Sequence, residues 1–281
     1  MLGVRKRLLV AALGVLPVVA VLAPVGTTAE AVTTWAPEST ATIKPGVQMY
    51  TAGAQCTANF VFKDAAGNVY VGYAAHCAGR GDSSDTNGCT TKSLPLGTPV
   101  SFVTGGNFFS SGRKVGTGRL AYSSWASMQK LGTRDPNRCR LNDFALVRVD
   151  RASVKNVNPT VPVFGGPVGL AAPPLSAGAK IYTVGNSSLR TGTPAKKTGR
   201  VLNRVGSGLV LGYDIQTGNP GIPGDSGSGF MDASGRAAGV LSTINVGLSL
   251  TPVTNTMGNI VYELAWAQKY SGIKGLVLAK G

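Results

Sequence analysis

The sequence is short of several residue types. It has one histidine, His76, in 281 residues, and 12 acidic residues against 27 lysines and arginines. Its four cysteines show no C-x-x-C spacing, which together with the single histidine argues against a zinc site. Beyond residue 25 no apolar run approaches the length of a membrane span, and no repeat of fixed period occurs. These absences disfavour a metal site, a polytopic membrane protein and a repeat array.

The positive charge is spread along the chain. The formal net charge is +15, yet no cluster of lysines and arginines with interleaved aromatic residues indicates a nucleic-acid surface. We therefore expect no nucleic-acid partner. A basic protein of this kind is attracted to acidic polymers and anionic lipid, so we expect a loose association with an anionic cell envelope.

The N-terminus has the pattern of an export signal. A basic segment at 5–7 precedes an apolar stretch at 8–25, and a small-residue site, AEA, ends at Ala31. A retained membrane anchor is the alternative, but two prolines interrupt the apolar stretch. We predict a secreted protein. Loss of residues 1–31 removes three basic residues and one acidic residue, which changes the net charge from +15 to +13.

Four cysteines in an exported chain predict two disulfides, with three possible connectivities. Cys56 and Cys77 lie on the two runs of a predicted β-hairpin over 55–77. Their pairing leaves Cys89 and Cys139 as the second pair.

Short alternating runs dominate the rest of the chain, and 39 glycines and 16 prolines favour strands and turns over helices. Strands are expected at 98–103, 114–123, 143–149, 180–185, 198–205, 208–215, 227–232 and 236–244. Only residues 258–270 carry apolar residues on one helical face and predict a helix.

These patterns divide the chain into six segments. We expect a signal peptide at 1–31, a flexible leader at 32–46, an N-terminal β unit at 47–157, a linker at 158–179, a C-terminal β unit at 180–257, and a helix and tail at 258–281. The predicted class is all-β.

A serine framed by glycines, Ser226, lies in the sequence PGDSGSG. No Gly-Lys-Ser/Thr follows, so a phosphate-binding loop is excluded. A serine hydroxyl needs a base to become a nucleophile at neutral pH, and histidine is suited to this because its pKa is near 6.5. Glycines let backbone N–H groups face a developing oxyanion. Ser226 and His76 are therefore the candidate nucleophile and base.

The order of these residues restricts the fold. In α/β-hydrolases the histidine follows the nucleophile, and position 228 would be glycine rather than serine. A carboxylate must orient the imidazole, and Asp143 opens an apolar strand, where an unpartnered carboxylate is costly to bury. A strand-end or capping role, as expected for Asp135, is the alternative. Because Ser226 lies in the other half, we expect a cleft between the halves to hold the site.

The motifs AAHC, NDFALV and GDSGSG, in that order, resemble those of the chymotrypsin-like (trypsin family) serine proteases, especially their secreted bacterial branch. The resemblance covers roughly residues 47–270. It implies two antiparallel six-stranded Greek-key β-barrels with a C-terminal α-helix, and an active site between the barrels. We expect no metal and no cofactor, since the acidic stretch at 82–88 has the wrong spacing for a calcium loop and lacks its closing glutamate.

The resemblance also assigns roles. It implies that His76 is the general base, that Asp143 orients it and that Ser226 is the nucleophile. The N–H groups of Gly224 and Ser226 would form the oxyanion hole, and Ser242, in the sequence LST, would be a partner of Asp143.

The same resemblance implies that the Cys56–Cys77 disulfide fixes the histidine loop. It also shows a departure, because animal relatives pair the aspartate of the nucleophile motif with a new N-terminus that starts Ile-Val-Gly-Gly, which is absent here. Asp225 therefore needs another cation. Arg190 is the candidate, and a plain surface arginine is the alternative.

The substrate pocket also departs from the family pattern. Its base, six residues before Ser226, is Pro220 instead of aspartate, so we do not expect a preference for arginine or lysine. Ile244, beside Thr243, stands where relatives often have glycine and narrows the pocket toward small or medium apolar side chains.

The predicted function is that of a secreted, monomeric serine endopeptidase, which cleaves protein or peptide substrates through an acyl-enzyme on Ser226. The alternative is a catalytically silent homologue that serves as an extracellular binding module. An esterase that uses the same site is a third possibility.

Overall fold

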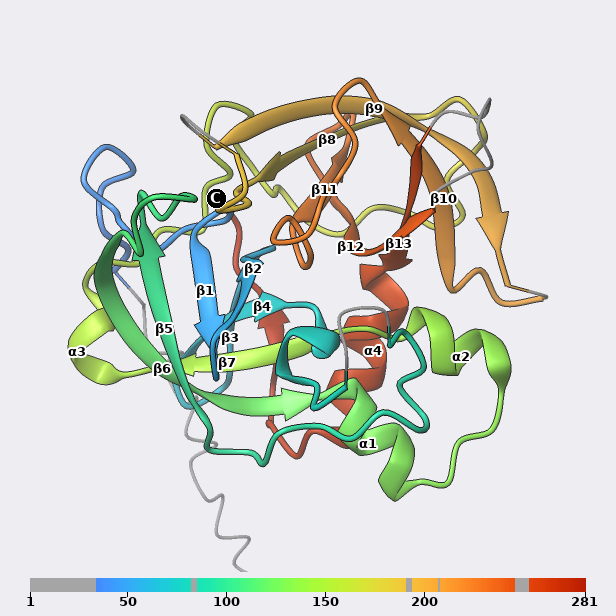
Figure 1. Ribbon diagram of the computed structural model, residues 1–281, viewed down its shortest axis with the longest axis horizontal. Helices are drawn as coiled ribbons and strands as arrows, with labels where there is room; N and C mark the ends of the chain where they lie inside the picture. Colours follow the sequence, from blue (N-terminus) through green and yellow to red (C-terminus); the bar gives the residue numbers. More distant parts are fainter. Residues whose placement is uncertain (1–33, 82–84, 191–193, 207, 246–252) are drawn as a thin grey trace, which may run out of the picture.

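The computed structural model describes residues 34–281, apart from residues 82–84, 191–193, 207 and 246–252. The predicted signal sequence at 1–31 therefore lies outside the described residues. Figure 1 shows two β units, with a helix leading from the second toward the first. No helix in the described part of the chain is both long and apolar enough to cross a membrane.

The first unit is a sheet of eight strands in which all neighbours pair antiparallel. Across the sheet the strands are β14 (Val277–Leu278), β3 (Val61–Lys63), β4 (Val69–Tyr73), β7 (Ala145–Val149), β6 (Arg113–Ser123), β5 (Pro99–Thr104), β1 (Gln48–Thr51) and β2 (Ala54–Thr57). The resemblance implied a six-stranded barrel here. Instead, strand β14 from the C-terminal tail extends the sheet beside β3, and no strand pairing among the described residues closes it.

The second unit is a closed barrel of six antiparallel strands, as expected. Around the barrel they are β10 (Gly212–Thr217), β13 (Thr254–Asn259), β12 (Ala237–Asn245), β11 (Gly229–Asp232), β8 (Lys180–Gly185) and β9 (Ala195–Val205). The predicted all-β class with a C-terminal helix is confirmed. Strand β13 is an addition, because no strand was predicted between residues 244 and 258.

The C-terminal helix α4 (Ile260–Tyr270) packs against the first unit although it follows the second in the chain. Its apolar face, which includes Ile260, Leu264 and Ala267, belongs to the same buried cluster as β3, β4 and β7. Trp266 also donates its indole N–H to the hydroxyl of Ser127, at 3.0 Å. The helix therefore ties the two units together.

Four further helical segments lie in the first half: η1 (Ala75–Ala78), α1 (Ser124–Lys130), α2 (Pro136–Leu141) and α3 (Arg151–Val154). They are too short to show a helical period, so the pattern did not predict them. Asp135 does have the expected capping role, since its side chain accepts the N–H of Arg138 at 2.9 Å and Pro136 opens helix α2.

The leader expected to be flexible at 32–46 is instead held against the first unit from residue 36 onward. Ala36 and Ile43 donate their N–H groups to Val157 and Asn156, at 2.9 and 3.0 Å. The Ile43 side chain is fully buried in the first core. The Thr- and Pro-rich composition indicated an open chain, but a single buried isoleucine and these backbone bonds fix the segment.

Candidate active site

His76 lies on the short helix η1, directly after strand β4, and the Cys56–Cys77 disulfide ties this segment to β2. The second disulfide joins Cys89 and Cys139, so the predicted pairing is confirmed in both cases. Sulfur and nitrogen atoms of Cys56, His76 and Cys77 lie within 4.8 Å of one another. Both sulfurs are committed to the disulfide, so this group offers no thiolate to a metal ion.

Asp143 precedes strand β7 and directs its buried carboxylate at His76. Its Oδ2 lies 2.7 Å from Nδ1 of the imidazole, and its Oδ1 accepts the backbone N–H of His76 at 2.9 Å. The Ser242 hydroxyl, from β12, donates to Oδ2 at 2.7 Å. The carboxylate therefore orients both the ring and the main chain of the histidine.

The ionisation of the pair follows from these contacts. Burial alone would lower the pKa of His76, but the charge of Asp143 and its hydrogen bond outweigh burial and hold that pKa above its ordinary value. Burial alone would raise the pKa of Asp143, but His76 and the Ser242 hydroxyl hold it below its ordinary value. A protonated imidazole is thus stabilised at this position.

Ser226 lies on the loop between β10 and β11, and this loop packs against the histidine segment. The carbonyl of Ser226 accepts the N–H of Thr57 at 2.8 Å. The next residue, Gly227, has φ +87°, and a Cβ there would lie 2.7 Å from the nitrogen of Ala74. A glycine is therefore required at position 227. The backbone of the serine loop lies directly against Ala74, which is two positions before His76 in the sequence.

The Ser226 hydroxyl itself makes no hydrogen bond with any residue that the structure describes. His76, Asp143 and Ser242 are joined through their side chains, whereas Ser226 joins them only through its loop backbone. The serine as a whole is half-buried.

Three backbone N–H groups of this loop are without a partner among the described residues, namely those of Asn219, Gly224 and Ser226. The N–H groups of Asp225, Gly227 and Ser228 all donate to backbone carbonyls. Gly224 has φ +91°. The carbonyl of Pro223, which shares a peptide group with the Gly224 N–H, accepts the hydroxyl of Ser187 at 2.5 Å and so fixes the direction of that N–H. Gly224 and Ser226 are the two residues predicted to form an oxyanion hole, and that role stays a prediction.

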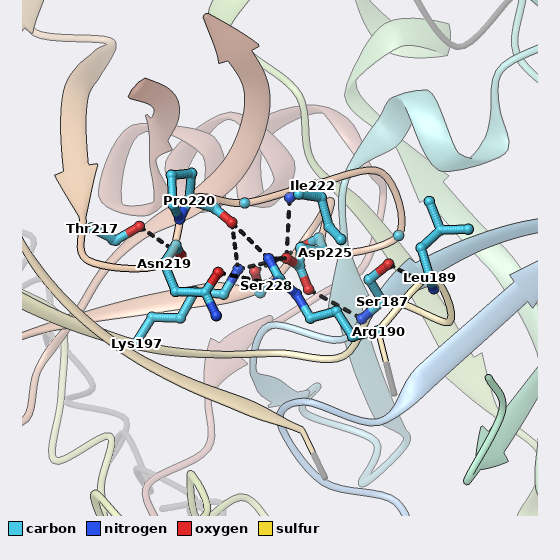
Figure 2. Close-up of polar contacts among 12 residues, drawn as sticks. Ser187, Leu189, Arg190, Lys197, Thr217, Asn219, Pro220, Ile222, Asp225 and Ser228 are labelled. Carbon is cyan, nitrogen blue, oxygen red and sulfur yellow. Dashed lines mark hydrogen bonds and ion pairs between the residues drawn. The ribbon is translucent and has the colours of Figure 1, made fainter. Parts of the chain in front are cut away.

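Asp225 is fully buried and faces two cations, as Figure 2 shows. Its Oδ2 lies 3.2 Å from Nη2 of Arg190 and 2.5 Å from Nζ of Lys197. The N–H groups of Ile222 and Ser187 donate to the same carboxylate, at 3.1 Å each. Arg190 was the expected cation.

Lys197 was not expected. Its side chain is 1% exposed on strand β9, against 22% for that of Arg190. Burial lowers the pKa of Lys197, and the neighbouring Asp225 opposes this effect. The sequence shows only two adjacent lysines at 196–197, and no local pattern indicates which of them points into the barrel.

The residues predicted for the substrate pocket lie on two segments of the chain, and the side chain of Asn255 bridges these segments by hydrogen bonds. The carbonyl of Pro220 accepts from Nη2 of Arg190 at 2.7 Å and from Nζ of Lys197 at 3.4 Å, so both cations that face Asp225 also contact the residue predicted for the pocket base. Buried Asn255 bonds both backbone groups of Gly221 and donates to the carbonyl of Thr243 at 3.3 Å. Ile244 is partly exposed on the same strand, β12, and the chain beyond it at 246–252 lies outside the described residues.

Two of the cavities on the described surface can be compared with the site. One, of about 830 Å³, lies beside the Cys89–Cys139 disulfide, and the other, of about 930 Å³, runs along β8, β9 and β10 and reaches Pro220. Neither is lined by His76, Asp143 or Ser226. The groups with catalytic potential therefore lie outside both cavities.

No family model and no curated protein sequence matches this chain. Solved structures that are similar to this chain include three bacterial proteases. Thermobifida fusca Protease A shares 17% identity over 85% of this chain and 99% of its own, with a TM-score of 0.49. The Nocardiopsis protease NAPase shares 19% over 84% and 98%, with a TM-score of 0.47. Cellulomonas bogoriensis chymotrypsin shares 18% over 85% and 98%, with a TM-score of 0.43.

Proposed function

We propose that this protein is a secreted serine endopeptidase that hydrolyses peptide bonds through an acyl-enzyme on Ser226. One observation carries the proposal: the buried carboxylate of Asp143 holds His76 through Nδ1 and through its main chain. The loop of Ser226 packs against the residues just before that histidine. At the similarity found above, the solved proteases add no weight, so the assignment rests on these contacts.

The proposed acylation uses each group once. Asp143 fixes the tautomer with the proton on Nδ1, which leaves Nε2 of His76 as the base. Ser226 Oγ attacks the scissile carbonyl carbon while its proton passes to Nε2. The free N–H groups of Gly224 and Ser226 meet the negative charge that develops on the carbonyl oxygen.

Collapse of this intermediate breaks the carbon–nitrogen bond, and the departing amine takes the proton from His76. The acyl group remains on Ser226. A water molecule then gives a proton to His76 and attacks the ester, and the reverse sequence releases the acid and restores the serine. The raised pKa of His76 supports the intermediate in which the imidazole carries the proton.

Asp225 supports the loop in its reactive shape without help from a new N-terminus. Lys197 and Arg190 supply the positive charge from within the chain. We infer that these cations take the place of the N-terminal ammonium used by the animal relatives.

The pocket residues favour a substrate with a small or medium apolar side chain before the cleaved bond. Pro220 offers no charge to an arginine or lysine side chain, and its carbonyl is already occupied by Arg190. Ile244 adds an apolar wall. The cut sites in a mixed peptide library, read by mass spectrometry, test this preference.

The disulfides support an extracellular location, where such bonds persist. We also propose that the protein associates with anionic envelope surfaces through the turn between β5 and β6. Phe108 and Phe109 are 71% and 85% exposed there and contact each other edge to face. Arg113 and Lys114 follow on the exposed start of β6, and residues 86–134 contain no acidic residue.

Co-sedimentation with vesicles tests this association. We expect binding to vesicles that contain phosphatidylglycerol and none to pure phosphatidylcholine. The double variant Phe108→Ser/Phe109→Ser should lose binding, whereas Leu209→Ser, which removes another exposed apolar side chain, should not. Equal binding by all three proteins would contradict a role for this turn.

The alternative of a catalytically silent binding module has one observation in its favour, because the Ser226 hydroxyl is not hydrogen-bonded to His76 among the described residues. Labelling with a fluorophosphonate separates the two functions, since only an activated serine reacts. We expect labelling that Ser226→Ala abolishes. Absence of labelling in folded protein between about pH 6 and pH 9, where the histidine becomes neutral, would favour the binding module. An esterase would label too, so peptide hydrolysis is measured beside it.

A further inference from the structure

One buried carboxyl group is not used by the proposed mechanism, although it contacts the site. Glu263 lies in the first turn of helix α4 and is fully buried. Its Oε1 accepts the backbone N–H of Asp143 at 3.0 Å. Its Oε2 has no hydrogen-bond partner among the described residues. The group therefore lies directly behind the residue that orients the histidine.

The space around Glu263 is shaped to hold a carboxyl group. Gly258, near the end of β13, faces it, and a Cβ at that position would collide with Oε1 and lie 2.9 Å from Cδ. Asn259 already caps the helix by accepting the N–H of Val261 at 3.1 Å. Glu263 is thus free of a capping role and turns toward Asp143.

The surroundings of Glu263 supply no positive charge within the described part of the chain. The titratable groups that face it are the Asp143 carboxylate and the hydroxyls of Tyr122 and Tyr262. Burial, and next the charge of Asp143, raise the pKa of Glu263 well above its ordinary range, although the N–H of Asp143 opposes this. Two adjacent buried carboxyls do not both ionise, and Asp143 is the one that has the imidazole.

We propose that Glu263 is a positioning residue, which as a neutral carboxylic acid holds the main chain of Asp143 so that the Asp143 carboxylate meets His76. The proposal rests on the proposed function. A neutral acid accepts the backbone N–H without placing a second negative charge near the imidazole. A charged Glu263 would raise the pKa of His76 further, so that less of the imidazole would be neutral and able to accept the serine proton at neutral pH.

Two substitutions separate position from charge. Glu263→Gln keeps a carbonyl acceptor and is neutral at every pH. Glu263→Leu has a similar size but leaves the N–H of Asp143 buried without a partner. Because His76 is the only histidine, its NMR titration reports on the pair without ambiguity and needs no substrate.

For Glu263→Gln we expect the His76 titration midpoint to stay at the wild-type value and kcat to stay within about twofold. For Glu263→Leu we expect the midpoint to fall and kcat to drop about 100-fold with KM little changed, since a small displacement of a catalytic group has effects of this size. Gly258→Ala, which pushes on the same carboxyl from the other side, should act in the same direction and serves if the leucine variant does not fold.

A lower His76 midpoint in Glu263→Gln would show that Glu263 is charged and would overturn the proposal. So would wild-type values of both midpoint and kcat in Glu263→Leu. If the wild-type protein does not react with a fluorophosphonate, the peptidase assignment fails, but the titration still decides whether Glu263 positions Asp143.

Discussion

The two buried aspartates of the site are stabilised in different ways. Asp143 faces an imidazole whose charge can change, together with a hydroxyl and a backbone N–H. Asp225 faces the ammonium of Lys197 and the guanidinium of Arg190, together with two backbone N–H groups. Both carboxylates have the partners that burial demands. Only the first has a partner that can take up and release a proton near neutral pH.

This difference divides the site into a part whose charge changes during the proposed reaction, around Asp143, and a part whose charges stay the same, around Asp225. The charge on His76 rises and falls during the proposed reaction, so the surroundings of Asp143 must tolerate both states. Asp225 holds a loop, and a permanent pairing with a guanidinium suits that task. Changes near Asp143 should therefore alter rate, whereas changes near Asp225 should first alter stability.

The largest expected effect is on rate. Asp143→Asn keeps the shape but favours the wrong imidazole tautomer, and it removes the charge that stabilises the protonated ring. We expect kcat to fall about 10⁴-fold while the fold is retained, as for such substitutions in Ser-His-Asp sites generally. Peptide hydrolysis and circular dichroism check this. An asparagine variant with a tenth of normal activity would show that the carboxylate is not needed.

The next effect is on stability. Lys197→Met removes a fully buried cation, and we expect the free energy of unfolding to fall by about 3 kcal/mol. Arg190→Gln removes the partly exposed cation, and about 1 kcal/mol is expected, because solvent screens that pair. Urea unfolding of both variants measures the difference. Equal losses would mean that the two cations are equivalent.

A fall in pH should lower activity through the His76–Asp143 pair. His76 must be neutral to accept the serine proton, and its pKa lies above the ordinary value, so kcat/KM should fall about tenfold per pH unit below that pKa. The pair should stabilise the fold between two limits. The Asp143 contribution is lost as pH falls through its lowered pKa, and the His76 contribution as pH rises through its raised pKa. A pH–rate profile without an acidic limb would contradict the assignment of the base.

The smallest effect concerns Ser242. Ser242→Ala removes one of the donors to Asp143, and about a tenfold loss of kcat is expected, in keeping with the loss of one hydrogen bond to a charged group. The unfolding free energy of this variant should change less than that of Lys197→Met. Steady-state kinetics and urea unfolding on the same preparation make the comparison. A larger loss of unfolding free energy in Ser242→Ala than in Lys197→Met would show that Ser242 has mainly a structural role.

The sequence was sufficient for groups that lie in recognisable local patterns. His76, Asp143, Ser226 and Ser242 each stand in a short motif, so their order along the chain could suggest a shared site before any contact was seen. The disulfides followed from cysteine count and a hairpin. Most strands followed from alternation, because side chains of a strand face opposite sides in turn.

Other groups could not be predicted because their role is set by a distant partner. Glu263 meets Asp143 across 120 positions of sequence, and Lys197 meets Asp225 across 28. Nothing in the neighbouring residues distinguishes Glu263 from the exposed acid of an ordinary first helical turn. The leader was misjudged for the same reason, since its order depends on contacts of Ile43 with residues near 157.

The short strand β14 has a consequence for biogenesis. Because Val277 and Leu278 pair with β3 and residues of α4 fill the first core, the N-terminal sheet lacks an outer strand and part of its interior until residues 260–278 have been synthesised. A nascent chain that ends before these residues is therefore incompletely folded. This delay fits the secretion proposed above, in which an extended polypeptide crosses a membrane before its cysteines are oxidised.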